Sequence, residues 1–308
     1  MPTAPARLVV AINPSASFGA TSAVGPAVVQ TLRASGHDVT ALTEPDFESL
    51  QDAARRALAT RPDALVVVGG DGMVNLGVNL LAGSKVPLGI VPSGTGNDMA
   101  RGLGIPYENT EESIRHLEAA LERRPRVIDA ARVSWDGQAE GSDGAGERWF
   151  ACALSAGFDA IVNERANAMR HPKGPSRYIL ALLAELVRLK PIAYRIVADG
   201  EVREVRANLV SLGNGVSLGG GMKITPDALL DDGLLDVFVV SPLSKVNFLR
   251  IFPRVFQGTH VDHPAVDIAR ARRVRLEADG IVAYGDGERI APLPIDVELV
   301  PGALRVLA

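Results

Sequence analysis

Three continuous apolar runs, each ending in glycine or small polar residues, constrain the fold of this 308-residue chain more than any other feature. They are LVVAI at residues 8–12, ALVVVGG at 64–70 and PLGIV at 87–91. Apolar runs without alternation are typical of strands covered on both faces, as in a parallel sheet with helical crossovers. Segments with helical spacing, such as residues 47–61, separate them. The pattern predicts a doubly wound α/β domain, whose ligands bind beyond the carboxyl ends of its strands.

The pattern changes after VIDAARVSWDG at residues 127–137. From there on, extended segments with turns between them dominate, at residues 193–214, 234–240, 272–278 and 280–288. Only one helix is predicted among them, at residues 177–189. Several strands with few helices favour a mainly antiparallel second domain. The tail at 295–308 has strand character, and we expect it to return to the first domain.

Composition narrows the class of protein. The net charge of −4 argues against a general nucleic-acid binder, which normally carries a strong basic excess. Cys152 is the only cysteine, so an internal disulfide is excluded and a reducing, cytoplasmic location is expected. The N-terminus reads as a strand and not as a signal peptide. The longest apolar stretch, at 178–187, is too short to span a membrane.

Small polar turns follow the apolar runs, and these turns carry the functional signal. GGDG at 69–72 is compatible with a phosphate-binding turn and, equally, with a tight turn capped by aspartate. PSGTGNDMAR at 92–101 and NPSAS at 13–17 close two other strands in the same way. Three such turns at one sheet edge favour a nucleotide site. Since a carboxylate repels phosphate, Asp71 is best explained by a Mg²⁺ ion between them.

The order and spacing of the motifs resemble those of the diacylglycerol kinase catalytic family, and most closely its stand-alone bacterial lipid kinases. The motifs are NPSAS, Thr43, GGDGMVN, PSGTGNDMAR, SAGFDA, GGGMKITPDALLDDGLLDV and YGDGE. The resemblance implies an α/β ATP-binding domain at 1–130, to which 291–308 return, and a β-sandwich lipid-binding domain at 131–290. It also implies an ATP-dependent kinase that phosphorylates a hydroxyl of a membrane lipid, diacylglycerol or a related one.

The same resemblance implies residue roles. Glu288 would be the general base that takes the proton of the lipid hydroxyl, and Asp71 would position the nucleotide's Mg²⁺ through water. A second, structural Mg²⁺ would lie on the side chain of Asp232 and the backbone carbonyls of Leu229 and Leu234. The positions implied to hold ATP are Asn13, Pro14, Ser15, Ala16, Ser17, Thr43, Gly69, Gly70, Asp71, Gly72, Met73, Val74, Asn75 and Thr95.

Two residues depart from the family pattern. Met73 stands where a threonine is usual, and Leu76 where a glutamate is common. Met73 cannot form a strong hydrogen bond, so we expect one nucleotide contact to be missing, at a cost of about 0.5–1.5 kcal/mol. A lipid- or nucleotide-binding protein with weak or no turnover therefore remains an alternative. A kinase of a soluble substrate, such as an NAD kinase, is another.

Two further patterns in the sequence have competing interpretations. Gly215 to Gly219 fit the GxSxG nucleophile elbow of serine hydrolases, but glycines and Pro226 follow instead of the required helix. Basic residues around RHPKGPSRY, at 170–178, together with Arg165, suggest either a solvated loop or peripheral contact with an anionic membrane surface. The resemblance also leaves a homodimer open as the quaternary structure.

Overall fold

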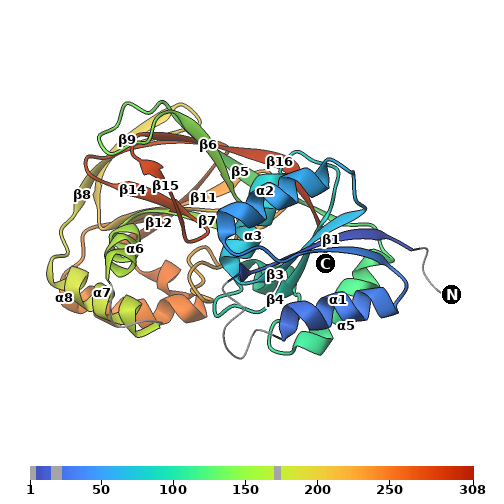
Figure 1. Ribbon diagram of the computed structural model, residues 1–308. Helices are drawn as coiled ribbons and strands as arrows, with labels where there is room; N and C mark the ends of the chain where they lie inside the picture. The colour runs from blue at the N-terminus through green and yellow to red at the C-terminus, as the bar shows by residue number, and fades with distance from the viewer. Residues whose placement is uncertain (1–4, 15–22, 170–174) are drawn as a thin grey trace. The chain divides into compact units, whose positions relative to one another are not determined.

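The computed structural model of the chain describes residues 5–14, 23–169 and 175–308 (Figure 1). Residues 1–130 and 301–308 form one compact unit, and residues 131–300 form a second. The sequence prediction assigns residues 291–300 to the segment that returns to the first domain. The structure places them in the second unit, because Ile295 and Val297 are buried there and pair with Leu276 and Val274.

The first unit is a parallel sheet with helices on both faces. Its elements are β1 (Arg7–Ile12), α1 (Val24–Ala34), β2 (Asp38–Leu42), α2 (Phe47–Leu58), β3 (Ala64–Gly69), α3 (Asp71–Leu81), β4 (Leu88–Pro92), α4 (Asp98–Leu103) and α5 (Thr110–Leu121). The strand order is β2-β1-β3-β4, and all of these pairs are parallel. The end of the chain adds a parallel neighbour to β4, through Val306 and Leu307. The predicted return of the C-terminus is therefore present.

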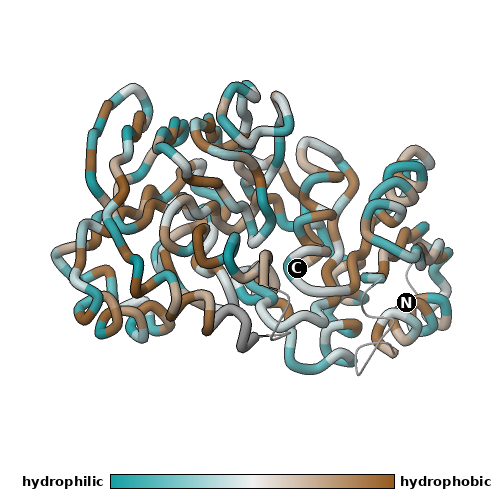
Figure 2. Tube along the Cα trace, turned by 60° about the vertical axis from the view of Figure 1, so that its left-hand side comes forward, coloured by the Kyte–Doolittle hydropathy of each residue, from teal (hydrophilic) through white to brown (hydrophobic). Residues whose placement is uncertain are grey.

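Burial explains why the strands of this sheet are apolar throughout. Helices α1 and α5 lie on one face, and α2 and α3 on the other (Figure 1). Every residue of β3 and β4 is buried, as expected for strands that are covered twice. Helices α1, α2 and α5 instead bury only one face, and hydrophobic residues alternate with hydrophilic ones along much of the tube in Figure 2. The doubly wound α/β prediction is confirmed.

The second unit is a β-sandwich. Its strands are β5 (Arg126–Trp135, which begins in the first unit), β6 (Gly146–Phe150), β7 (Ala153–Gly157), β8 (Ile192–Ala198), β9 (Glu201–Ala207), β10 (Leu209–Gly213), β11 (Leu235–Val240), β12 (Val266–Ala271), β13 (Arg273–Glu277), β14 (Val282–Gly285), β15 (Glu288–Pro292) and β16 (Ile295–Leu307). One antiparallel sheet has the order β12-β11-β10-β7-β14-β15. The other contains β16-β13-β8-β9 together with β5 and β6. The inward-facing side chains of both sheets form one core, which includes Phe150, Leu212 and Leu276.

Helices in this unit are more numerous than the sequence predicts. The predicted helix is α7 (Pro175–Val187); the structure adds α6 (Phe158–Ala168), α8 (Lys245–Ile251) and the 3-10 helices η2 (Phe252–Gln257) and η3 (Thr259–Asp262). Phe158, Phe248 and Phe252 pack their rings together and join α6, α8 and η2 into a second small core. None of the described helices is long and apolar enough to cross a membrane.

Candidate active site

The first glycine turn joins β3 directly to α3. The strand ends at Gly69, Gly70 is the N-cap, and the helix begins at Asp71. Gly70 makes no side-chain cap, and its carbonyl accepts hydrogen bonds from the backbone N–H groups of Met73 and Val74 at 3.0 and 3.2 Å. The N-terminus of an 11-residue helix, with its partial positive charge, therefore follows the carboxyl end of a central strand. Such a position suits the binding of phosphate.

The second glycine turn lies directly against the first. Ser93 N–H donates to the carbonyl of Gly69 at 2.9 Å. A Cβ atom added to Gly94 would lie 2.4 Å from the Cα of Gly70, so the two backbones touch at a distance that only glycine permits. Asn97, in the left-handed conformation, closes this turn by bonding both the N–H and the carbonyl of Gly94. The two polar turns of the sequence thus form one structural feature.

Asp71 links the same two turns through its carboxylate. One oxygen accepts from the N–H of Asn97 at 3.0 Å and the other from the N–H of Asp98 at 2.8 Å. Burial, followed by the charge of Asp98, raises the pKa of Asp71, while the two backbone hydrogen bonds oppose that shift. A divalent cation would relieve the repulsion between these two carboxylates. The link between Asp71 and residues 97–98 was not predicted from the sequence.

Other predicted ATP contacts follow neighbouring strands of the same sheet. Asn13 and Pro14 follow β1, Thr43 follows β2 and Thr95 follows β4, while Ser15, Ala16 and Ser17 lie outside the described residues. Because the strands are parallel and adjacent, these positions lie at one sheet edge with Gly70. Thr43 and Thr95 are exposed there. The structure brings these residues together, and their role in holding ATP stays a prediction.

Met73, Val74 and Asn75 differ from the other positions because their side chains are buried. The exposed fraction of Met73 is 2%, and a Cβ atom placed on Gly69 would lie 2.4 Å from its Cγ. Met73 therefore packs across Gly69 as part of the core. Contacts between these three residues and a nucleotide would have to come from their backbone. The sequence interpretation of Met73 as a lost hydrogen-bonding position did not include this packing role.

Met73→Thr tests the packing role. Replacing a buried methionine by a smaller, polar side chain should lower the free energy of unfolding by about 2–4 kcal/mol. Nucleotide affinity should change by no more than about tenfold, because a single neutral hydrogen bond is at stake. Urea denaturation and ATP titration of both proteins would check this. A variant as stable as the wild type, with much tighter ATP binding, would contradict the packing role.

In the second unit, Glu288 begins β15 after a two-residue hairpin turn. Asp286 and Gly287 form the turn, with φ angles of 50° and 84°. The Asp286 carboxylate accepts hydrogen bonds from the N–H groups of Ala151, Cys152 and Ala153 at 2.8–3.0 Å. Its own N–H donates to the carbonyl of Ala153. Asp286 thereby fixes the hairpin to the start of β7, and the exposed Glu288 is held at a defined place on the sandwich.

A second Asp-Gly-Glu hairpin in the same unit has the same construction. Asp199 and Gly200 have φ angles of 48° and 94°, and Glu201 begins β9. The Asp199 carboxylate accepts from the N–H groups of Arg272 and Arg273, and its N–H donates to the carbonyl of Arg273. The hairpin geometry alone therefore does not identify a catalytic glutamate. It does provide Glu201 as a matched comparison for Glu288.

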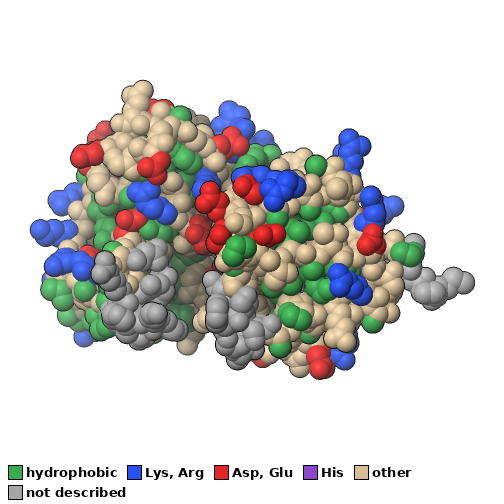
Figure 3. All heavy atoms as spheres, viewed as in Figure 1, with side chains coloured by type: hydrophobic (Ala, Val, Ile, Leu, Met, Phe, Trp, Pro, Cys, Tyr) green, Lys and Arg blue, Asp and Glu red, His purple; other side chains and the backbone are tan. Residues whose placement is uncertain are grey.

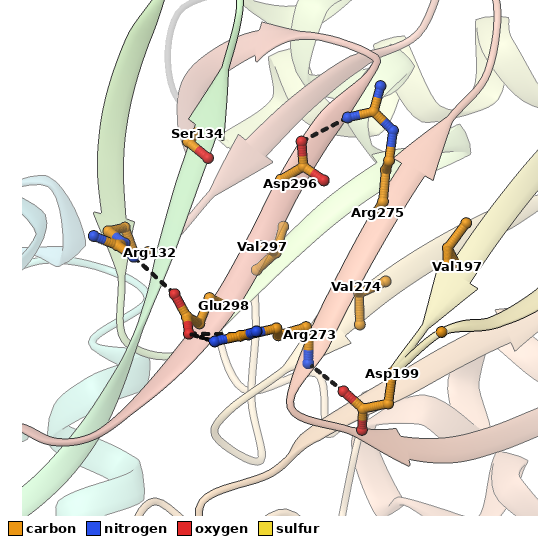
Figure 4. A pocket seen from close by; sticks show the side chains of 11 residues that line it. Arg132, Ser134, Val197, Asp199, Arg273, Val274, Arg275, Asp296, Val297 and Glu298 are labelled. Carbon is orange, nitrogen blue, oxygen red and sulfur yellow. Dashed lines mark hydrogen bonds and ion pairs between the residues drawn. The ribbon is translucent and has the colours of Figure 1, made fainter.

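The Asp199 hairpin borders a shallow pocket of about 560 Å³ on the second unit. Figure 4 shows that its charged side chains bind one another: Arg132 and Arg273 contact Glu298, and Arg275 contacts Asp296. Arginine and carboxylate groups neutralise each other across neighbouring strands, which is the usual pattern of a solvated sheet face. None of the predicted site residues lines this pocket, and we do not assign it a role in phosphate transfer.

At the predicted metal position, the carboxylate of Asp232 is paired with an arginine side chain. Arg270 bonds Asp232 at 3.3 Å and Asp236 at 3.2 Å, and the N–H of Leu234 donates to Asp232. Among the described residues, no group of three or more His, Cys, Asp or Glu side chains could hold a metal ion. As these side chains lie, they do not fit a metal, which would have to displace Arg270. The metal at Asp232, Leu229 and Leu234 stays a prediction.

Asp159, in the first turn of α6, is a partly buried titratable group beside the second core. Burial raises its pKa to about 6, against the effect of hydrogen bonds from the backbone of Ala160 and the side chain of Ser155. Its Oδ1 atom is buried without a hydrogen-bond partner. The native state therefore holds this proton over a pH range in which the unfolded chain has released it.

Asp159→Asn should reveal this proton in the pH dependence of stability. Between about pH 4 and 6, the wild type loses stability as pH rises, because the native state binds the proton more tightly; the full effect is about 3 kcal/mol at most. The variant should be more stable than the wild type above about pH 6, by up to that amount, and should show no gain below about pH 4. Urea denaturation across this range measures both. An equal difference at every pH would contradict the assignment.

The structure also tests the competing hydrolase motif. Residues 214–234 follow β10 without forming a helix, and Leu218 pairs with Met222 in an isolated bridge. Ser217 is buried. The strand-turn-helix context that a nucleophilic serine needs is therefore missing at this position, as the sequence predicts.

Comparison with known proteins covers nearly the whole chain. Residues 7–133 match the family described as the diacylglycerol kinase catalytic domain, and residues 152–308 match the YegS C-terminal NAD kinase beta sandwich-like domain. A diacylglycerol kinase of Mycobacterium tuberculosis is 39% identical over 297 residues, covering 96% of this chain and 93% of that protein. A probable YegS-like lipid kinase of Stenotrophomonas maltophilia is 30% identical, covering 79% and 78% of the two chains.

Solved structures show the same fold at lower identity. A putative diacylglycerol kinase from Bacillus anthracis superposes with a TM-score of 0.76 at 24% identity, covering 99% of this chain and 98% of that one. Yeast NADH kinase superposes with a TM-score of 0.59 at 12% identity, covering 99% and 83%. These likenesses show that the α/β unit and the β-sandwich occur together in both groups of kinases.

Proposed function

We propose that this chain, which belongs to the diacylglycerol kinase family, transfers the γ-phosphate of ATP to a hydroxyl group of a membrane lipid, diacylglycerol or a related one. The observation that carries the proposal is the contact between the Gly70 and Gly94 turns at the carboxyl edge of the parallel sheet. The approach of two backbones without Cβ atoms leaves N–H groups and a helix N-terminus close together, which suits a polyphosphate.

The residues of the first unit fit ATP as the donor. The N-terminus of α3 would bind phosphate oxygens, and the exposed Thr95 and Thr43 would add neutral hydrogen bonds along the same edge. Bound Mg²⁺ would neutralise charge on the phosphates. Asp71 and Asp98 are the carboxylates near this edge that would hold the ion, Asp71 through water, since both of its oxygens already accept backbone N–H groups.

Glu288 acts as the general base in this proposal. Its carboxylate takes the proton from the acceptor hydroxyl while that oxygen forms a bond to the γ-phosphorus, and the bond from the γ-phosphorus to the β-phosphate oxygen breaks to release ADP. Phosphoryl transfer depends mostly on positioning and charge stabilisation, with one group to orient the nucleophile. Asp286 supports Glu288 by anchoring its hairpin to residues 151–153.

The NAD kinase alternative differs from this proposal in the acceptor of the phosphate. It is kept because the chain shares its fold with yeast NADH kinase. ADP release would be measured with ATP and Mg²⁺ and, in turn, diacylglycerol in mixed micelles, other hydroxyl lipids, and NAD in solution. We expect ADP release above background only with a lipid acceptor. Release with NAD alone would favour the soluble-substrate kinase, and ATP binding without release in any arm would favour a binding protein.

A further inference from the structure

Exposed apolar side chains gather on α7, α8 and η2 of the second unit. They are Leu180, Leu183 and Val187 on α7, Val246 and Leu249 on α8, and Phe256 on η2. The exposed fractions of Val187 and Val246 are 71% and 58%, which are large for valine side chains in a folded chain. Single exposed apolar residues are normal, but a contiguous group of them marks an interaction surface.

The spacing of these residues places them on the outward faces of their helices. Leu180, Leu183 and Val187 recur at i, i+3 and i+7, which is one stripe of a helix. The opposite face of α7 buries Ala181 and Leu186 in the core that includes Phe248 of α8.

The exposed apolar residues of α7 adjoin those of α8. The ammonium group of Lys245, at the start of α8, donates a hydrogen bond to the carbonyl of Val187 at the end of α7. This bond places Val187, at the end of α7, close to the start of α8, where Val246 directly follows Lys245. We call the six exposed apolar residues, with the basic residues beside them, the α7–α8 surface.

Charge on this surface has one sign. Residues 241–257 contain Lys245, Arg250 and Arg254 and no aspartate or glutamate, although the whole chain has a net charge of −4. Arg188 and Lys190 follow α7, and the only acid within residues 180–190 is Glu185, which is buried and paired with Arg165 and Arg188. Figure 3 shows Lys and Arg side chains beside hydrophobic ones at the left of the view, where Figure 1 places α8.

We propose that the α7–α8 surface docks onto the surface of an anionic lipid bilayer. Apolar side chains enter the headgroup region, and the lysines and arginines around them contact negatively charged headgroups. A second copy of the chain fits less well, because two like-charged surfaces would face each other. The inference rests on the proposed function in one respect: a kinase whose acceptor lies in a bilayer has to bind that bilayer. The basic residues at 170–174, predicted from the sequence to contact a membrane, lie outside the described residues.

Flotation of the full chain with lipid vesicles tests the proposal. The vesicles would contain phosphatidylcholine alone or with about 30 mol% phosphatidylglycerol, at low and high salt. One variant combines Leu183→Ser with Leu249→Ser, and another combines Lys190→Gln with Arg250→Gln. The control combines Phe47→Ser on α2 with Val202→Ser on β9, which are also exposed apolar residues.

We expect the wild type and the control to float with anionic vesicles, and each test variant to bind about tenfold more weakly or worse. Binding of the charge variant should also depend less on salt, because two of the five basic residues of the surface are neutralised. Equal flotation of all four proteins would overturn the proposal. So would light scattering that shows a wild-type dimer and monomeric Leu183→Ser/Leu249→Ser, since the surface would then join two copies.

A separate readout distinguishes this surface from the proposed function. Phosphorylation of a short-chain, water-dispersed diacylglycerol would be measured for the same four proteins. Normal turnover of this acceptor by the test variants, with weak flotation, supports membrane docking as a separate property of the surface. Flotation of the wild type without phosphorylation of any lipid would support the surface and overturn the proposed kinase function.

Discussion

Glu288→Gln is expected to lower the rate of phosphate transfer to lipid by about 10²–10⁴-fold, the usual contribution of a general base. The amide cannot take the proton of the attacking hydroxyl, whereas the hairpin is held by Asp286 and should not change. ATP binding, which the proposal assigns to the first unit, should therefore remain within about twofold of the wild type. Steady-state transfer to diacylglycerol in mixed micelles and ATP titration measure the two effects.

Glu201→Gln is the matched control. Glu201 follows an Asp-Gly turn with nearly the same φ angles, begins a strand of the same unit and is also exposed. Because the substitution is chemically identical, any general effect of losing an exposed carboxylate after a hairpin should appear in both variants. We expect transfer by Glu201→Gln to equal that of the wild type. Equal rates for Glu288→Gln and the wild type would remove Glu288 from the mechanism.

Asp71→Ala is expected to abolish measurable transfer and to lower the free energy of unfolding by about 2–6 kcal/mol. The stability loss follows because two N–H groups, of Asn97 and Asp98, lose their acceptor, at about 1–3 kcal/mol for each unsatisfied buried group. The loss of transfer follows because the second glycine turn loses two of its links to the first, and because the carboxylate proposed to hold Mg²⁺ is removed. Urea denaturation and transfer assays measure both.

Asp71→Asn and Asp46→Ala separate these two causes. Asparagine keeps one acceptor oxygen, so Asp71→Asn should be more stable than Asp71→Ala, yet need a higher Mg²⁺ concentration for transfer. Asp46 caps α2 by accepting from the N–H of Ser49, and its removal should leave transfer unchanged. Full transfer by Asp71→Asn at the Mg²⁺ concentration used for the wild type would contradict the metal role of this carboxylate.

The sequence predicted the fold because its strongest signals are local. Apolar runs covered on both faces and small polar turns at their ends suffice to predict the parallel sheet, and the edge that gathers Asn13, Thr43, Gly70 and Thr95 follows from strand direction. Helices α6 and α8 were missed because α6 follows Gly157, where a strand turns into a helix, and α8 is only seven residues long. Short elements depend on tertiary packing, here on the rings of Phe158 and Phe248.

The interior of the candidate site could be predicted only in part. A polar turn in the sequence indicates a ligand-binding edge, but it does not show which side chains turn inward. Met73 packs across Gly69 because the first turns of α3 are buried, a consequence of three-dimensional packing. Likewise, the acidic turn at Asp232 gives no sign that Arg270, from a strand distant in sequence, lies between Asp232 and Asp236. The Asp-Gly pair at 286–287 predicts a tight hairpin turn, but nothing local shows that the Asp286 carboxylate accepts from the backbone of residues 151–153, which are far away in sequence.

The most direct test of the central claim is the recovery of labelled phosphate in lipid. The wild-type protein would be incubated with ATP labelled at the γ-phosphate, Mg²⁺ and dispersed diacylglycerol, and the extracted lipid would be separated and identified by mass. The proposed function predicts that the label appears in a lipid phosphomonoester, one phosphate for each ADP formed. Label that stays in ATP, or appears only as inorganic phosphate or in a water-soluble product, would contradict it.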